Sequence, residues 1–151
     1  MKWLGLFIII IFGCNQRLNN LTEPPNCEEL AQIVNTGWKK VEDENSKLRH
    51  SCKKGFTRGF SHAINSDSCV LKKDELIKLL GKPDEIVDRA MDYFRLINPE
   101  LKTDDYYTYW YKCYSDRKVI VRGTIEYAQK NIFVLIDRES EIIKETFETG
   151  L

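Results

Sequence analysis

Apolar residues recur at intervals of three and four along the segment from residue 27 to residue 49. Such spacing places them on one face of an α-helix, because a helix turns once every 3.6 residues. Asn26 and Glu29 resemble the two ends of a capping box, which favours a helix start here. We therefore expect one amphipathic helix over about 27–49, interrupted only by Gly37. Its apolar stripe comprises Cys27, Leu30, Val34, Trp38, Val41 and Leu48.

Two shorter helices are expected in the middle of the chain. Apolar residues fall at helical spacing over 72–80, and the following Gly81-Lys82-Pro83 is typical of a helix end. The same spacing over 85–97, ahead of Asn98-Pro99, predicts a third helix. Residues 53–68 combine two glycines with scattered apolar residues and a polar end, which indicates a loop with room for one helical turn.

From Asp105 onward the pattern becomes that of β-strands. Residues 106–114 are aromatic and β-rich, 115–117 indicate a turn, and 119–127 alternate between apolar and polar. Two further strands are expected over 132–136 and 142–149. Short connections require antiparallel neighbours. The sequence thus predicts an α+β fold in two layers, with two to three helices packed on one face of a four-stranded antiparallel meander, and a single domain over 26–151.

The composition limits the classes of function. The chain has 151 residues, with 23 basic and 23 acidic side chains and a formal charge of zero. A neutral chain offers no field for binding nucleic acid, so no nucleic-acid partner is expected. Charged residues make up 30% of the chain, which excludes a protein that crosses a membrane many times.

The first fourteen residues indicate export. Lys2 precedes an apolar run over 3–12, which is shorter than the roughly 20 residues of a membrane span. The end of this run, Ile11-Phe12-Gly13-Cys14, resembles the lipobox of bacterial lipoproteins. That resemblance implies cleavage of residues 1–13 as a signal peptide and acylation of Cys14, for example with palmitate. The membrane is therefore an expected partner, through a lipid anchor on Cys14.

Residues 14–25 then comprise the lipidated cysteine and a flexible tether, because the stretch is rich in asparagine and ends in Pro24-Pro25. Asn15 follows Cys14, and by resemblance to the best-studied sorting rule this favours the outer membrane. We expect a lipid-anchored protein of the bacterial cell envelope that faces the periplasm.

Four further cysteines, an even number in an exported chain, predict two disulfides. They are Cys27, Cys52, Cys69 and Cys113. A bond between the first two is disfavoured, because a continuous helix would separate them by roughly 37 Å. Two pairings remain: 27–113 with 52–69, or 27–69 with 52–113. We favour the first, because a 52–69 bond closes the predicted loop and a 27–113 bond joins helix to sheet.

Candidate chemistry is sparse. The possible metal ligands His50, Cys52, His62 and Cys69 match no standard zinc spacing, and disulfide formation competes for the two thiols. The chain has no HExxH, GxSxG, P-loop or CxxC sequence. We expect no catalytic residue, metal or cofactor, and hence a protein that is not an enzyme. A thiol- or metal-dependent hydrolase is retained as a less favoured hypothesis.

A longer resemblance covers roughly residues 70–148. It is carried by the helix and corner over 74–84, by Trp110-Tyr111 within a strand, and by 134–137 before a turn. These features resemble the SmpA/OmlA family of small lipoproteins, which is related in fold to the β-lactamase inhibitor proteins. The long first helix, the insertion over 85–104 and the four paired cysteines depart from the family pattern. The resemblance implies accessory assembly work or protein binding through the sheet.

Aromatic residues of the first predicted strand are the candidate partner-binding residues. Helices cover one face in a two-layer fold, so either the odd-numbered or the even-numbered set should be more exposed, and exposed Tyr and Trp are favoured at interfaces. The candidates are Tyr107, Tyr109, Tyr111 and Trp110. We expect an anchored module that binds an envelope protein. The alternative is a small-ligand-binding lipoprotein that uses a groove between helices and sheet.

Overall fold

The structure is a computed structural model that describes residues 27–40, 50–66 and 69–150. The predictions of a signal peptide over 1–13, of lipidation at Cys14 and of a tether over 14–25 lie outside the described residues, as do Val41 and Leu48 of the first predicted helix.

Four α-helices lie within the described residues. They are α1 (Cys27–Gly37), α2 (Phe56–Asn65), α3 (Lys73–Leu80) and α4 (Asp92–Ile97), and a 3₁₀ turn, η2 (Thr103–Asp105), precedes the long strands. The helix predicted over 72–80 is confirmed as α3, which ends at Leu80 and is followed by Gly81 with φ of +90°. The loop predicted over 53–68 is wrong, because this segment contains α2.

Within the described ranges, six strands form one mixed sheet. They are β1 (Trp38–Lys40), β2 (His50–Cys52), β3 (Glu85–Val87), β4 (Tyr106–Val121), β5 (Thr124–Asp137) and β6 (Ile143–Gly150). The order is β1-β2-β4-β5-β6, with β3 also paired to β4, and β2 runs parallel to β4 where Ser51 pairs with Tyr114. The predicted four-stranded antiparallel meander is therefore wrong, although β4, β5 and β6 are antiparallel neighbours.

The long helix predicted over 27–49 is also wrong, because α1 ends at Gly37 and the chain continues as β1. A Cβ atom on Gly37 would lie 2.6 Å from Cδ2 of Phe56, so only glycine permits the observed approach of α2. Trp38 follows and is buried, and its indole Nε1 donates a hydrogen bond to the Leu80 carbonyl at 2.9 Å. Contacts distant in sequence thus override the helical spacing.

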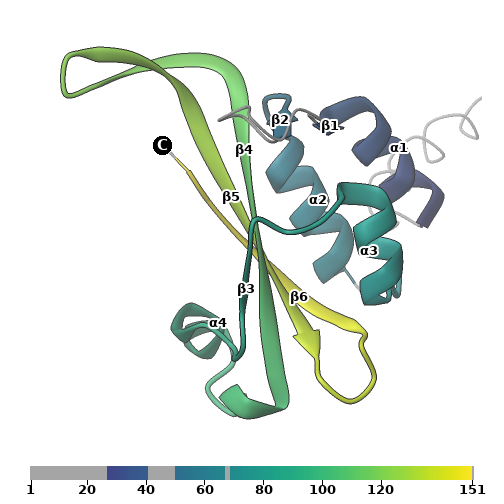
Figure 1. Ribbon diagram of the computed structural model, residues 1–151. Helices are drawn as coiled ribbons and strands as arrows, with labels where there is room; N and C mark the ends of the chain where they lie inside the picture. The colour runs from purple at the N-terminus through teal and green to yellow at the C-terminus, as the bar shows by residue number, and fades with distance from the viewer. Residues whose placement is uncertain (1–26, 41–49, 67–68, 151) are drawn as a thin grey trace, which may run out of the picture.

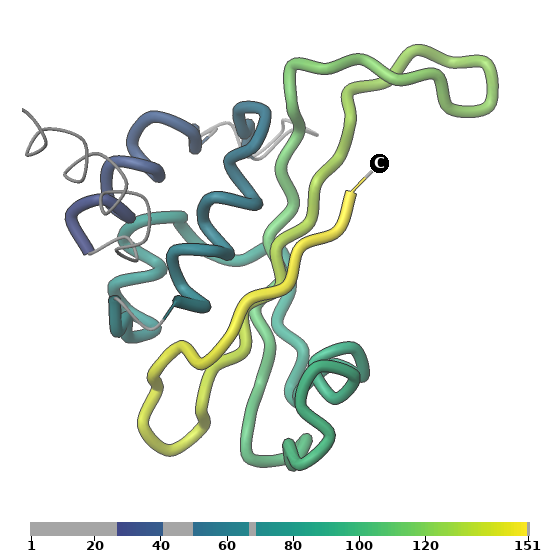
Figure 2. The backbone as a smooth tube through the Cα atoms, turned by 180° about the vertical axis from the view of Figure 1, so that it is seen from behind, coloured from purple at the N-terminus to yellow at the C-terminus, as the bar shows by residue number. Residues whose placement is uncertain are grey.

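Helices lie on both faces of the sheet (Figures 1 and 2). The first three helices cover one face, and their apolar residues pack with Tyr109, Tyr111 and Ile132 in the main core. The short helix α4 lies on the opposite face, where Phe94 packs against Phe133 and Leu135 in a second cluster. The prediction that helices cover one face only is therefore incorrect. The third helix predicted over 85–97 is split into β3 and α4.

A side chain from α2 occupies the outer edge of β6. The Thr146 N–H donates to Asn65 Oδ1 at 2.8 Å, and Asn65 Nδ2 donates to the Thr146 carbonyl at 2.9 Å. The amide of Asn65 therefore makes the two hydrogen bonds that a neighbouring strand would make. An open strand edge is a site for unwanted pairing between chains, and Asn65 blocks it at the middle of β6.

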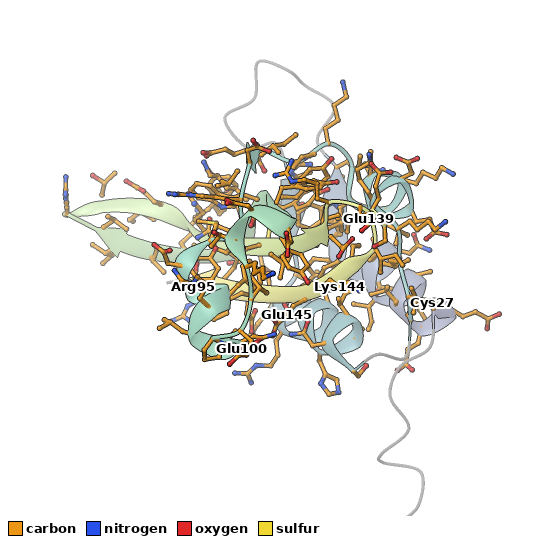
Figure 3. All side chains as sticks on the ribbon, turned by 90° about the horizontal axis from the view of Figure 1, so that it is seen from below. Cys27, Arg95, Glu100, Glu139, Lys144 and Glu145 are labelled. Carbon is orange, nitrogen blue, oxygen red and sulfur yellow. A yellow bond between two sulfur atoms is a disulfide. The ribbon has the colours of Figure 1, made fainter. Side chains whose placement is uncertain are left out.

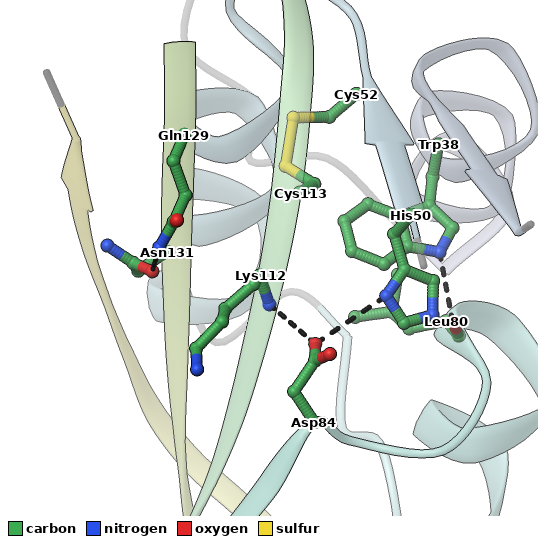
Figure 4. Close-up of a disulfide and its surroundings, with 9 residues drawn as sticks. All are labelled: Trp38, His50, Cys52, Leu80, Asp84, Lys112, Cys113, Gln129 and Asn131. Atoms are coloured by element: carbon green, nitrogen blue, oxygen red, sulfur yellow. Dashed lines mark hydrogen bonds and ion pairs between the residues drawn. A yellow bond between two sulfur atoms is a disulfide. The ribbon is translucent and has the colours of Figure 1, made fainter. Parts of the chain in front are cut away.

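The four cysteines form two disulfides, as predicted, but not in the favoured pairing. Cys27 is bonded to Cys69 and Cys52 to Cys113. The favoured pairing, 27–113 with 52–69, assumed a continuous helix after Cys27. Because α1 ends early, β2 lies beside β4 and brings Cys52 to Cys113 (Figure 4).

Candidate functional site

Three of the seven large apolar side chains that are exposed among the described residues lie on the hairpin that joins β4 to β5. We call residues 116–127 the hairpin arm. Within it Ile120 is 77% exposed, Ile125 67% and Tyr127 45%. Ile120 pairs directly with Ile125, and Lys118 pairs with Tyr127. Directly paired residues point to the same face of a ribbon, and so do residues i and i+2 along one strand. The four side chains therefore share one face of the arm.

The turn at the tip of the arm has a clear local cause. Arg122 and Gly123 both have positive φ, at 51° and 83°. This combination defines a type I′ hairpin turn, for which glycine is favoured because it lacks a Cβ. The turn predicted over 115–117 is wrong: β4 continues through this region, with an irregularity in its pairing between Tyr114 and Lys118. There the arm bends away from the first three helices (Figures 1 and 2).

The arm consists of two strands only. Pairing of β5 with β6 extends no further than Lys130, and β2 meets β4 at Tyr114. Among the described strands, residues 118–121 and 124–127 therefore pair only with each other. A two-stranded ribbon is marginally stable by itself, and its outer edges present unpaired N–H and C=O groups. These properties make the arm suited to contact with another chain.

A cavity of about 600 Å³ lies at the base of the arm. Trp38, Tyr114 and Tyr127 supply aromatic walls, and Lys39, Ser51 and Asp116 supply polar groups. Because Tyr127 lines this cavity and also lies on the exposed face of the arm, the two features form one continuous surface. The volume falls within the range of about 300–1,000 Å³ that is common for small-ligand sites.

A buried polar cluster lies beside the Cys52–Cys113 disulfide (Figure 4). His50 stacks on Trp38 with ring centroids 4.7 Å apart, and its Nδ1 lies 3.6 Å from Oδ2 of Asp84. That same carboxylate oxygen accepts a hydrogen bond of 2.7 Å from the Lys112 N–H. The cluster ties β2 and the segment before β3 to β4. A cysteine nucleophile next to His50 would need a free thiol, and Cys52 is oxidised here.

The tyrosines of β4 lie in the interior. Tyr109 is 6% exposed and Tyr111 is fully buried beneath the first three helices. Burial raises the pKa of the Tyr111 phenol, which donates a hydrogen bond to the Gly81 carbonyl. Tyr107 and Tyr109 also have pKa values raised by burial. Tyr109 and Tyr111 are therefore corrected from candidate partner-binding residues to core residues.

The other two candidates are half-buried. Tyr107 packs at the margin of the main core, 5.5 Å from the Tyr109 ring. Trp110 faces the second cluster, where its ring packs on Phe133 and its Nε1 donates to Asn131. The predicted alternation is confirmed, since odd and even residues face opposite sides. Neither face of this part of β4 is an open aromatic surface.

The hypothetical metal ligands are dispersed. Cys52 and Cys69 belong to different disulfides, His50 is buried and His62 is exposed on α2. Across residues 27–40, 50–66 and 69–150, no group of three or more His, Cys, Asp and Glu side chains is arranged to hold a metal ion. No helix in those ranges is both long enough and apolar enough to cross a bilayer.

The arm was not identified from the sequence. A signal for it exists, because Arg122-Gly123 separates two short β-branched runs, as in a tight hairpin. Treating 119–127 as one strand hides that signal. No protein-family model, curated protein or solved structure matches this chain.

Proposed function

We propose that this protein is a non-enzymatic binding module of the bacterial cell envelope, held to the membrane by lipid on Cys14, and that it binds a partner protein through the hairpin arm. The proposal is carried by one observation, the exposure of Ile120 and Ile125 on a projecting two-stranded ribbon. The lipobox-like sequence at 11–14 and the resemblance of 70–148 to the SmpA/OmlA family support the location and the class of function.

The arm suits a protein partner with an extended segment. Its open strand edges allow main-chain hydrogen bonds to an added strand, and its apolar face offers a contact for alternate side chains of that strand. The arm carries the cations Arg117, Lys118 and Arg122 against the carboxylates Asp116 and Glu126. This excess of positive charge favours a partner strand that combines apolar residues with acidic ones.

The position of the arm suits an anchored protein. Cys27, the first described residue, lies on the opposite side of the molecule from the arm (Figure 3). Twelve residues separate Cys14 from Cys27, and a chain of that length spans at most about 40 Å. Attachment at this end would present the arm on the side away from the lipid.

In vivo photo-crosslinking tests the proposal. A photo-reactive amino acid at position 120 or 125 should capture one discrete envelope protein, whereas the same group at position 96 should not. Leu96 is a matched control, because it is 83% exposed but lies on α4. Mass spectrometry of the same sample should show acylation of Cys14 after loss of residues 1–13.

A second experiment with the purified partner excludes chance capture. The double variant Ile120→Ser/Ile125→Ser should weaken association at least about tenfold, because apolar anchors dominate interface energy. Leu96→Ser should leave it unchanged. Equal crosslinking from positions 96 and 120, or unchanged affinity of the double variant, would rule out the arm as the interface.

The aromatic cavity favours a second candidate function, the binding of a small apolar or aromatic ligand. Saturable quenching of Trp38 fluorescence by such a ligand, with no effect of the Ile120→Ser/Ile125→Ser change, would favour this candidate over protein binding. Trp38 is the tryptophan that lines the cavity.

A further inference from the structure

A second cavity, of about 280 Å³, lies between the start of α2 and the inner face of β4 and β5. Five basic side chains surround it: Lys53, Lys54, Arg58, Arg117 and Lys130. Glu148 supplies the one carboxylate among the described lining residues, and its Oε1 lies 4.0 Å from Nε of Arg58. In a chain with equal numbers of acidic and basic residues, this local excess of positive charge is a specific feature.

Two largely buried residues that carry hydroxyl groups also line the cavity. Thr57 is 6% exposed and Ser115 is 5% exposed. Neither hydroxyl makes a side-chain hydrogen bond to another described residue, whereas the buried Thr146 hydroxyl donates to the Ser61 carbonyl. Among the described residues, the buried side-chain atoms without a hydrogen-bond partner are His50 Nδ1 and Ser61 Oγ, so the Thr57 and Ser115 hydroxyls remain accessible from the cavity. Both groups are therefore available as donors to a ligand in the cavity.

We infer that this cavity binds a phosphate group. A phosphate carries nearly two negative charges and several strong acceptor oxygens, which match cations around the rim and hydroxyl donors within. The volume lies below the range of drug-sized sites, so the cavity fits a single charged headgroup. The positive end of the α2 dipole, next to Gly55, adds to the attraction. The inference does not depend on the proposed function of the arm.

Titration of the purified full chain with inorganic phosphate, followed by amide NMR, tests this assignment. The Thr57 and Ser115 amides should shift saturably, and added salt should weaken the binding. Lys54→Gln/Lys130→Gln should reduce affinity at least about tenfold through lost charged hydrogen bonds. The matched pair Lys78→Gln/Lys144→Gln removes the same charge from exposed positions outside the cavity and should retain affinity within about twofold.

A third variant separates a specific site from general positive charge. Thr57→Val keeps the shape and charge of the cavity but removes one hydroxyl, and it should weaken binding severalfold. The source of the phosphate is identified with monomeric short-chain phosphatidic acid, with the corresponding phosphatidylcholine as the control. If phosphatidic acid binds more tightly than inorganic phosphate, the ligand is a lipid headgroup. If the two bind equally, the ligand is a soluble phosphate. The inference would be overturned if neither phosphate nor phosphatidic acid caused saturable shifts. It would also be overturned if the two double lysine variants lost affinity for phosphate to the same extent.

Discussion

Asp137 shows how a single side chain can organise a turn. It lies at the end of β5, and its Oδ1 accepts hydrogen bonds from the Ser140 N–H at 2.7 Å, the Ser140 hydroxyl at 2.8 Å and the Glu139 N–H at 3.2 Å. These donors stabilise the charged form, so the hydrogen bonds from Ser140 hold the pKa of Asp137 below its ordinary value of 3.8. The connection from β5 to β6 therefore depends on an ionised carboxylate.

Replacement of Asp137 by alanine should lower the free energy of unfolding by about 1 kcal/mol at pH 7. The pKa of Asp137 is lower in the folded protein than in the unfolded chain. The carboxylate therefore makes its full contribution to the free energy of unfolding above the unfolded-state pKa, and that contribution is lost as the pH falls through the folded-state pKa. The difference between wild type and Asp137→Ala should therefore narrow in urea titrations below about pH 4. Glu139→Ala, in the same turn, is the control and should stay within about 0.5 kcal/mol of wild type at every pH.

At the scale of elements, two helical glycines have opposite roles. Gly59 lies inside α2, where a Cβ would meet only Cγ2 of Ile33 at an ordinary 3.8 Å. Gly37 is the last residue of α1, where a Cβ would overlap the ring of Phe56. Replacement of glycine by alanine is thus compatible with the packing at Gly59 and incompatible with it at Gly37.

Gly59→Ala should stabilise the fold by about 0.5–1 kcal/mol, because alanine restricts the unfolded chain and favours the helix. Gly37→Ala should destabilise it by about 1–3 kcal/mol through overpacking of the core. Thermal unfolding of the two variants in parallel checks the prediction. Stabilisation by both changes would show that α1 and α2 can move apart at Phe56 without loss of packing.

Elements with strong local signals were predicted from the sequence, and those that depend on distant contacts were not. The apolar spacing over 72–80 and the glycine after it predict α3 directly. The β-rich composition after Asp105 predicts strands there, but the alternating segment 119–127 is not one strand, because the turn at 122–123 divides it between β4 and β5. The three-residue strands β1, β2 and β3 have too few residues for periodicity to detect, because pairing partners from other elements create them. The candidate site was missed for the same reason: exposure of Ile120 depends on where β6 and the helices end.

For the whole molecule, the two disulfides are the strongest constraint outside the core. Cys27 and Cys69 are 42 residues apart, and Cys52 and Cys113 are 61 apart. Loops of this length correspond to about 4 kcal/mol each in a chain-entropy model. Together they join α1 to the segment before α3, and β2 to β4.

Peptide mapping without reduction should yield linked peptides containing Cys27 with Cys69 and Cys52 with Cys113. The double variant Cys52→Ala/Cys113→Ala should lose about 4 kcal/mol of stability in guanidinium unfolding. A double variant in which two exposed serine or threonine residues are replaced by alanine controls for the number of substitutions. Recovery of a Cys27–Cys113 peptide would refute the pairing and with it the parallel contact between β2 and β4.

The two disulfides interleave along the chain, in the order 27, 52, 69 and 113. Every peptide bond between residues 27 and 113 is consequently spanned by at least one of them, and those between 52 and 69 are spanned by both. A protease that cuts once anywhere in this interval releases no fragment, because the two pieces stay covalently joined. A single cut in this interval would therefore leave the molecule assembled as long as the disulfides stay oxidised.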